Sequence, residues 1–75
     1  MNQNSIQLEN QITGTKIFIV FDYKGDARDL ENMVSGCVED GLPIILKRDK
    51  QTYIILGKVY ENCLITIEHD YKLSL

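Results

Sequence analysis

Hydrophobic residues along the chain gather in three short runs that would be apolar on both faces of a β-strand. The runs are KIFIVF at Lys16–Phe21, PIIL at Pro43–Leu46 and TYIIL at Thr52–Leu56. A strand with one exposed face alternates apolar and polar residues, whereas a strand buried on both faces is a continuous apolar run. The pattern therefore predicts strands that need cover on two sides.

One helix is expected between the first two runs, and it can cover one side. It is predicted to begin after Asp26, whose carboxylate can accept hydrogen bonds from the first turn. It is predicted to end at Gly41, because glycine favours the left-handed C-terminal cap. Apolar residues recur along it at steps of three and four and form one stripe: Leu30, Met33, Val34, Cys37 and Val38.

Weaker signals flank these elements. Residues 5–9 alternate and predict a short edge strand, and Gly14 suits the tight turn that follows. The polar segment 48–51 predicts a hairpin turn between the second and third runs. Gly57 predicts a bulge or bend, after which residues up to Tyr60 continue the strand.

A final alternating segment completes the fold. Residues 63–69 place Cys63, Ile65 and Ile67 on one face of a last strand. The order of elements is then β-β-α-β-β-β. It predicts an α+β fold in a single compact domain over residues 1–75, with a five-stranded, mostly antiparallel sheet and one helix packed on one face.

The second face of this sheet has no helix to cover it. Such a face must curl into a barrel, meet another chain or remain an exposed apolar surface. The apolar residues expected there are Phe18, Val20, Ile45 and Ile54. We expect this face to drive self-association into a homodimer or higher oligomer, or to bind a partner.

The size and the first residues of the chain bound its location. Seventy-five residues make one domain with a thin core, which buries only roughly 60% of the surface of the unfolded chain. No run of about 18 apolar residues is present, so no membrane span or membrane partner is expected. The first eleven residues lack the basic start and apolar core of a signal peptide. We therefore expect a cytoplasmic protein with reduced thiols at Cys37 and Cys63.

The formal charge of −3 is unevenly distributed. The predicted helix carries an acidic face, and the predicted hairpin carries a basic patch beside an aromatic ring. Such asymmetry influences steering and the choice of partner. The acidic face, which would meet a protein partner, comprises Asp29, Glu31, Glu39 and Asp40. The basic patch, which would suit single-stranded nucleic acid, comprises Lys47, Arg48, Lys50 and Tyr53.

Catalytic and metal-binding signals are weak. Asp22, Asp26 and Asp29 gather where the first apolar strand meets the helix, but a helix cap with a dipole-matched first turn explains them better than a hard-cation site. A structural zinc site needs four ligands, usually in close pairs, and Cys37, Cys63 and His69 are scattered. We therefore expect no catalytic residues, no bound metal and no cofactor.

These observations favour binding over chemistry. A small, mildly acidic chain without catalytic motifs, rich in Asn, Gln, Ile and Lys, has the profile of many phage-encoded or mobile-element proteins that block a host enzyme or defence complex. We expect a non-enzymatic interaction protein whose partner is such a host protein, acting in the host cytoplasm. Two alternatives stay open: a small nucleic-acid-binding regulator that uses the basic hairpin, and an oligomeric nucleotide binder with its pocket at a subunit interface.

Overall fold

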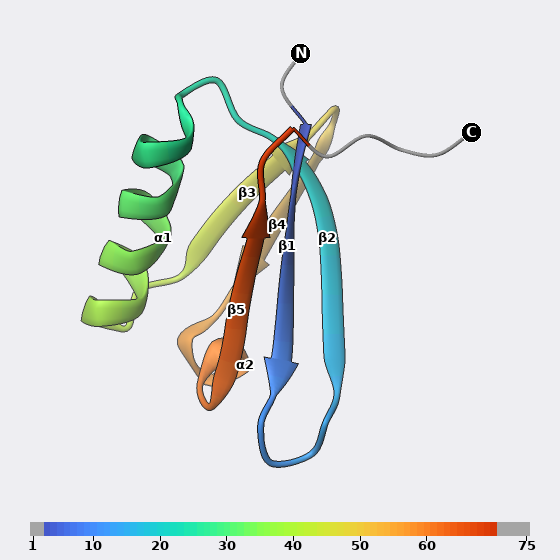
Figure 1. Ribbon diagram of the computed structural model, residues 1–75, viewed down its shortest axis with the longest axis vertical. Helices are drawn as coiled ribbons and strands as arrows, with labels where there is room; N and C mark the ends of the chain where they lie inside the picture. Colours follow the sequence, from blue (N-terminus) through green and yellow to red (C-terminus); the bar gives the residue numbers. More distant parts are fainter. Residues whose placement is uncertain (1–2, 71–75) are drawn as a thin grey trace.

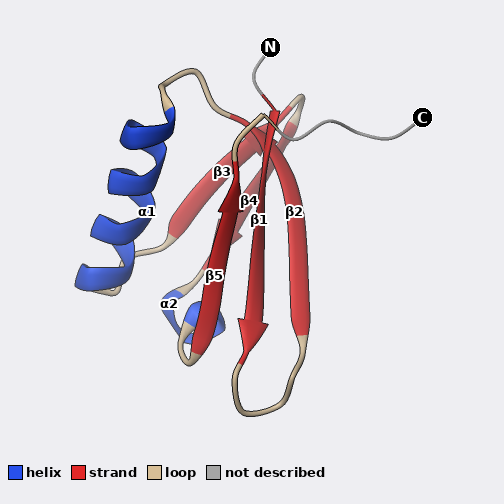
Figure 2. Cartoon of the chain, in the orientation of Figure 1, coloured by secondary structure: helices blue, strands red, loops and turns tan. Residues whose placement is uncertain are grey.

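A computed structural model describes residues 3–70 of the chain and confirms the α+β class (Figure 1). Strands make up most of the regular structure, and the main helix lies to one side of them (Figure 2). No helix of the described part is long and apolar enough to cross a membrane. In chain order the elements are β1 (Gln3–Asn10), β2 (Lys16–Asp22), α1 (Ala27–Asp40), β3 (Ile44–Arg48), β4 (Gln51–Ile55), the short α2 (Gly57–Tyr60) and β5 (Cys63–Glu68).

The five strands form one sheet in the order β4-β3-β2-β1-β5, and all neighbours are antiparallel. β2 and β3 share a single pair of opposing residues, Asp22 and Lys47. The sheet therefore splits into a three-stranded part and a β3–β4 hairpin that slants away from it (Figure 1). The core lies between these two parts, with α1 beside it.

The first strand is an inner strand of the sheet, between β2 and β5, so the prediction of a short edge strand was wrong. Within β1, Ile6 opposes Ile19 of β2 on one side and Ile67 of β5 on the other. Ile6 and Leu8 are fully buried as a result. β1 is not an edge strand because the last strand of the chain, β5, returns to pair with it. The edge strands are β4 and β5.

The ends of α1 confirm the local sequence signals. The Asp26 carboxylate accepts a hydrogen bond of 2.8 Å from the backbone N–H of Asp29, which satisfies one free donor of the first turn. Gly41 has a φ of 69°. The N–H of Leu42 then reaches back to the carbonyl oxygen of Cys37 at 2.8 Å, as in a Schellman cap.

The segment after β4 forms the helical turn α2, where a continuing strand was predicted. The turn brings the Tyr60 hydroxyl beneath the C-terminal end of α1, where it donates to the carbonyl oxygens of Leu42 at 2.8 Å and Cys37 at 3.1 Å. A buried hydroxyl requires such partners, and a straight strand would carry it away from them. Burial, with a further contribution from Cys37, raises the pKa of the Tyr60 phenol above its ordinary value. The hydroxyl therefore keeps the proton that it donates.

The helix covers only part of its sheet face. An α-helix is roughly 10 Å wide, whereas the outer strands of a five-stranded sheet lie about 19 Å apart at a spacing of about 4.8 Å. On the helix side, Ile65 and Ile67 of β5 are only partly buried, although they pack against the core. The buried core itself consists of Ile6, Leu8, Phe21, Leu30, Val34, Ile44, Leu46, Ile55 and Tyr60.

Candidate binding surfaces

The helix-free face of the sheet carries the apolar residues that the sequence predicts there. Ile45 of β3 and Ile54 of β4 lie directly opposite one another and are 52% and 60% exposed. Phe18 of β2 shares the face and is also more than half exposed. Val20 differs from these three, because it is only 7% exposed and offers little surface to a partner.

A further apolar residue on this face, Leu64 of β5, was not singled out from the sequence. It is exposed and opposes Glu9 of β1. The alternation of residues 63–68 already placed it opposite the inward-facing Ile65, so the signal was present. Apolar side chains are therefore exposed on the helix-free face at both edges of the sheet, with the polar Gln7 and Glu9 of β1 between β2 and β5.

The acidic residues of α1 do not form one surface. Asp29 lies in the first turn and Asp40 is the last residue of the helix, and both are exposed. Glu31 and Glu39 instead point along the side of the helix that faces β5, where both line a groove. Glu31 and Glu39 therefore share one surface, whereas Asp29 and Asp40 do not belong to it.

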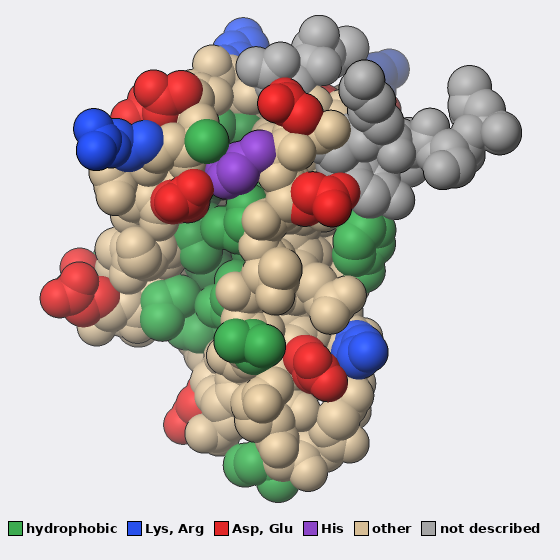
Figure 3. All heavy atoms as spheres, viewed as in Figure 1, with side chains coloured by type: hydrophobic (Ala, Val, Ile, Leu, Met, Phe, Trp, Pro, Cys, Tyr) green, Lys and Arg blue, Asp and Glu red, His purple; other side chains and the backbone are tan. Residues whose placement is uncertain are grey.

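The groove lies between α1 and the edge strand β5 and has a volume of about 430 Å³. Its floor and walls are largely apolar, and Figure 3 shows hydrophobic side chains in this region below the histidine, with acidic side chains on both sides. The sequence did not reveal this groove, because it depends on how little of the sheet the helix covers. Its lining residues are Glu31, Val34, Ser35, Val38, Glu39, Ile65 and Ile67.

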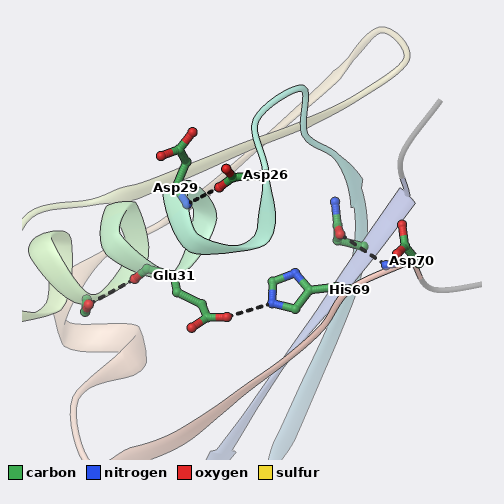
Figure 4. A network of polar contacts seen from close by, with 7 residues as sticks. Asp26, Asp29, Glu31, His69 and Asp70 are labelled. Atoms are coloured by element: carbon green, nitrogen blue, oxygen red, sulfur yellow. Dashed lines mark hydrogen bonds and ion pairs between the residues drawn. The ribbon is translucent and has the colours of Figure 1, made fainter.

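A side-chain contact joins the helix to the strand at one end of the groove. His69 Nε2 lies 3.0 Å from Glu31 Oε2, so the residue that follows β5 contacts α1 directly (Figure 4). The side chain of Glu31 is 61% exposed, so water screens this contact. The sequence did not predict this contact, because no local pattern indicates that His69 reaches a helix 38 residues earlier in the chain.

The backbone of β5 presents an open edge beside this groove. The N–H of Gln11 donates to the carbonyl oxygen of Asn62 at 2.9 Å, which fixes the alternation along the β1–β5 ladder. Leu64 and Thr66 then bond to β1, whereas the N–H and C=O groups of Ile65 and Ile67 point away from it. No described strand pairs with β5 on that side. The free edge faces α1 (Figure 1).

The basic patch is divided between two sides of the hairpin. Alternation places Lys47 on the helix-free side, whereas Arg48 and Tyr53 share the side of the buried Leu46. Tyr53 is partly buried, packs against the core and donates its hydroxyl to Gln51 Oε1 at 2.8 Å. Lys50 is exposed at the turn. The bases and the ring therefore do not form a joint stacking surface.

The structure assembles no metal centre from residues 3–70. No group of three or more potential ligands comes together among them. Cys37 and Cys63 are free, partly buried thiols, and Cys63 Sγ contacts the carbonyl oxygen of Val59 at 3.4 Å. Of the aspartates at the β2–α1 junction, Asp26 serves as the helix cap described above.

Comparison with other proteins gives no assignment. No known protein family matches the chain, and no curated protein or solved structure is significantly similar to it. Its function is therefore inferred from its own surfaces. Three of these stand out: the helix-free sheet face, the groove between α1 and β5, and the basic hairpin.

Proposed function

We propose that the chain is a non-enzymatic module that binds a protein partner through the helix-free face of its sheet. The observation that carries this proposal is the cross-strand pair Ile45 and Ile54, whose side chains are 52% and 60% exposed. Single exposed apolar residues are ordinary on a protein surface. Two directly opposed isoleucines form a small patch whose burial would contribute roughly 25 cal/mol per Å².

Charge favours a protein partner over a nucleic acid. The chain has a net charge of −3, whereas phosphate neutralisation supplies much of the affinity of nucleic-acid binding. The bases of the hairpin are also divided between two sides, and Tyr53 packs toward the core. An apolar patch that uses dispersion and hydrophobic burial needs no such positive surface.

Three finer expectations remain predictions. The first is that the partner is a host enzyme or defence complex blocked by a phage-encoded protein. The second is that the same face pairs two copies of the chain. The third comprises the two alternatives. A nucleic-acid binder requires an affinity for nucleic acid that falls steeply with salt. A nucleotide binder requires a rise in melting temperature with at least one of a panel of nucleotides.

The test compares partner capture by three tagged chains expressed in candidate host cells, with cross-linking and quantitative mass spectrometry. The double variant Ile45→Lys, Ile54→Lys removes the patch, and Thr66→Lys adds a charge at an exposed polar position of the same face. We expect the wild type and Thr66→Lys to enrich the same protein. The double variant should enrich it at least about tenfold less, since loss of a hot-spot residue costs about 2 kcal/mol or more.

Two outcomes would overturn the proposal. One is that the wild-type chain enriches no protein over an unrelated tagged control. The other is that the double variant captures the partner as well as Thr66→Lys does. Sedimentation of the purified chains shows whether the enriched protein is a second copy, because a dimer through this face dissociates in the double variant alone.

A further inference from the structure

We propose that the groove between α1 and β5 accepts an extended, basic segment of a partner protein, which adds to the sheet as a sixth strand antiparallel to β5. The site is separate from the helix-free face. If no peptide bound in the groove, the function proposed for the helix-free face would still stand. If the helix-free face bound no partner, the groove could still bind a peptide. Three features of the described residues lead to this inference: an open backbone edge, an apolar floor and an acidic border.

The open edge supplies the backbone hydrogen bonds. β5 is six residues long, and Ile65 and Ile67 direct their N–H and C=O groups away from β1. An antiparallel strand laid along this edge would bond to both residues. A peptide that adds to a sheet edge gains affinity from these main-chain bonds and specificity from its alternate side chains. At about 3.4 Å per residue, a segment of about six or seven residues matches the edge.

The groove supplies the sites for alternate side chains. Opposing residues of an antiparallel pair share a face, so peptide residues opposite Ile65 and Ile67 would point toward α1. There they would meet Val34 and Val38 across a groove of about 430 Å³. This volume and its apolar lining suit two aliphatic side chains spaced two residues apart. The peptide would supply the cover that the helix does not give β5.

Charge selects a basic segment. Glu31 and Glu39 line the helix side of the groove, and no lysine or arginine is among its lining residues. Glu68 lies at the end of β5 itself, on the opposite face. A segment with lysine or arginine on either side of the two aliphatic residues would therefore find a carboxylate at each end. Such complementarity raises association rates and disfavours acidic competitors.

The same charges argue against a second copy of the chain as occupant. The residues of β5 on the groove side of the sheet are Cys63, Ile65 and Ile67, so the β5 of another copy would bring no positive charge to Glu31 and Glu39. A basic segment from a different protein supplies that charge.

The test uses labelled peptides and fluorescence anisotropy. The symmetric peptide Lys-Thr-Val-Lys-Val-Thr-Lys presents two valines and two terminal lysines to the groove. We expect it to bind the full chain at concentrations below about 1 mM. Replacing its lysines by glutamates should weaken binding at least about tenfold. Methylating both valine nitrogens should abolish binding, because antiparallel pairing turns those nitrogens toward β5.

Matched variants of the chain locate the site. Val38→Lys places a charge in the groove at a residue that is already 39% exposed, so the fold is expected to survive. It should weaken binding of the basic peptide at least about tenfold. Ile54→Lys, on the helix-free face, should leave it unchanged. Circular dichroism and thermal melting confirm that both variants are folded.

Several results would overturn the inference. They are no binding by the basic peptide below about 1 mM, equal binding by the acidic or methylated peptide, and no effect of Val38→Lys. A dimer of the wild type that dissociates in Val38→Lys would also overturn it, because the occupant would then be a second copy. If Ile45→Lys, Ile54→Lys loses its cellular partner yet binds the peptide normally, the two sites are independent.

Discussion

β3 and β5 present the same kind of residues to the helix side of the sheet, yet only β3 is sealed. Ile44 and Leu46 of β3 are 0% and 2% exposed, whereas Ile65 and Ile67 of β5 stay partly buried. α1 packs directly on β3. On the β5 side, the groove separates the helix from the strand.

The difference follows from width. One helix cannot span a five-stranded sheet, so the shortfall must lie at one edge. In this chain it lies at the edge whose backbone is unpaired and whose surroundings are acidic. The sealed side supplies stability, and the open side is available for recognition. Four predictions test this division, from the largest expected effect to the smallest.

The first compares the same substitution on both strands. Ile44→Ala should lower the free energy of unfolding by roughly 2–5 kcal/mol, because it leaves a cavity in the closed core. Ile65→Ala should cost only about 1 kcal/mol, because water and side-chain rearrangement can fill the space beside an open groove. Chemical denaturation measures both. Equal losses would show that the β5 side is as closed as the β3 side.

The second prediction concerns α1, the helix that covers part of one face of the sheet. Gly41→Ala should destabilise by roughly 1 kcal/mol, since residue 41 has a φ of 69° that alanine adopts only with strain. Gly36→Ala, inside α1, should stabilise by about 0.5–1 kcal/mol, because an added Cβ meets no atom within 4 Å. Thermal melting of the two variants beside the wild type measures both effects. Destabilisation by Gly36→Ala would mean that the helix approaches the sheet more closely than described.

The third concerns the buried link between α2 and the end of α1. Tyr60→Phe should lower the melting temperature at neutral pH, because the carbonyl oxygen of Leu42 loses the hydroxyl donor and that of Cys37 keeps only the N–H of Leu42. Tyr53→Phe, whose hydroxyl bonds to the exposed Gln51, should change little.

The pH dependence of this link has a definite sign. The pKa of Tyr60 is raised in the folded state. The stability that its donated hydrogen bonds contribute is therefore fully present below the ordinary pKa of 10.0 and is lost as the pH rises through the folded pKa. The gap in stability between the wild type and Tyr60→Phe should therefore narrow above about pH 10. A gap that widens there would contradict a neutral, donating phenol.

The fourth concerns the exposed link on the open side. Glu31→Gln removes the charge that faces His69 while keeping the size of the side chain. Because this pair is exposed, stability should fall by no more than about 1 kcal/mol. Binding of the basic peptide should weaken more clearly, since Glu31 lines the groove. A loss of stability well above this value in urea denaturation would contradict the account, because the contact between Glu31 and His69 would then be needed to hold the fold together.

Local chemistry allowed most of the fold to be predicted from the sequence. Asp26 and Gly41 mark the helix ends because capping depends on a few adjacent residues. Alternation along residues 63–68 set the two faces of β5. The helix-free face with Ile45 and Ile54 followed from continuous apolar runs.

Features that depend on distant partners were missed. The inner position of β1 requires pairing with a strand more than fifty residues away. The turn α2 depends on Tyr60 reaching carbonyl oxygens 18 and 23 residues earlier. The groove depends on where α1 lies across the sheet, and no local pattern reports that position.

The central claim is that β5 has an open edge beside α1, and backbone amide hydrogen exchange measured by NMR tests it most directly. In the free chain, the N–H groups of Leu64 and Thr66 should be protected by β1, whereas those of Ile65 and Ile67 should exchange far faster. Adding the basic peptide should protect Ile65 and Ile67. Equal protection of all four amides in the free chain would contradict the account, because the edge would already be covered.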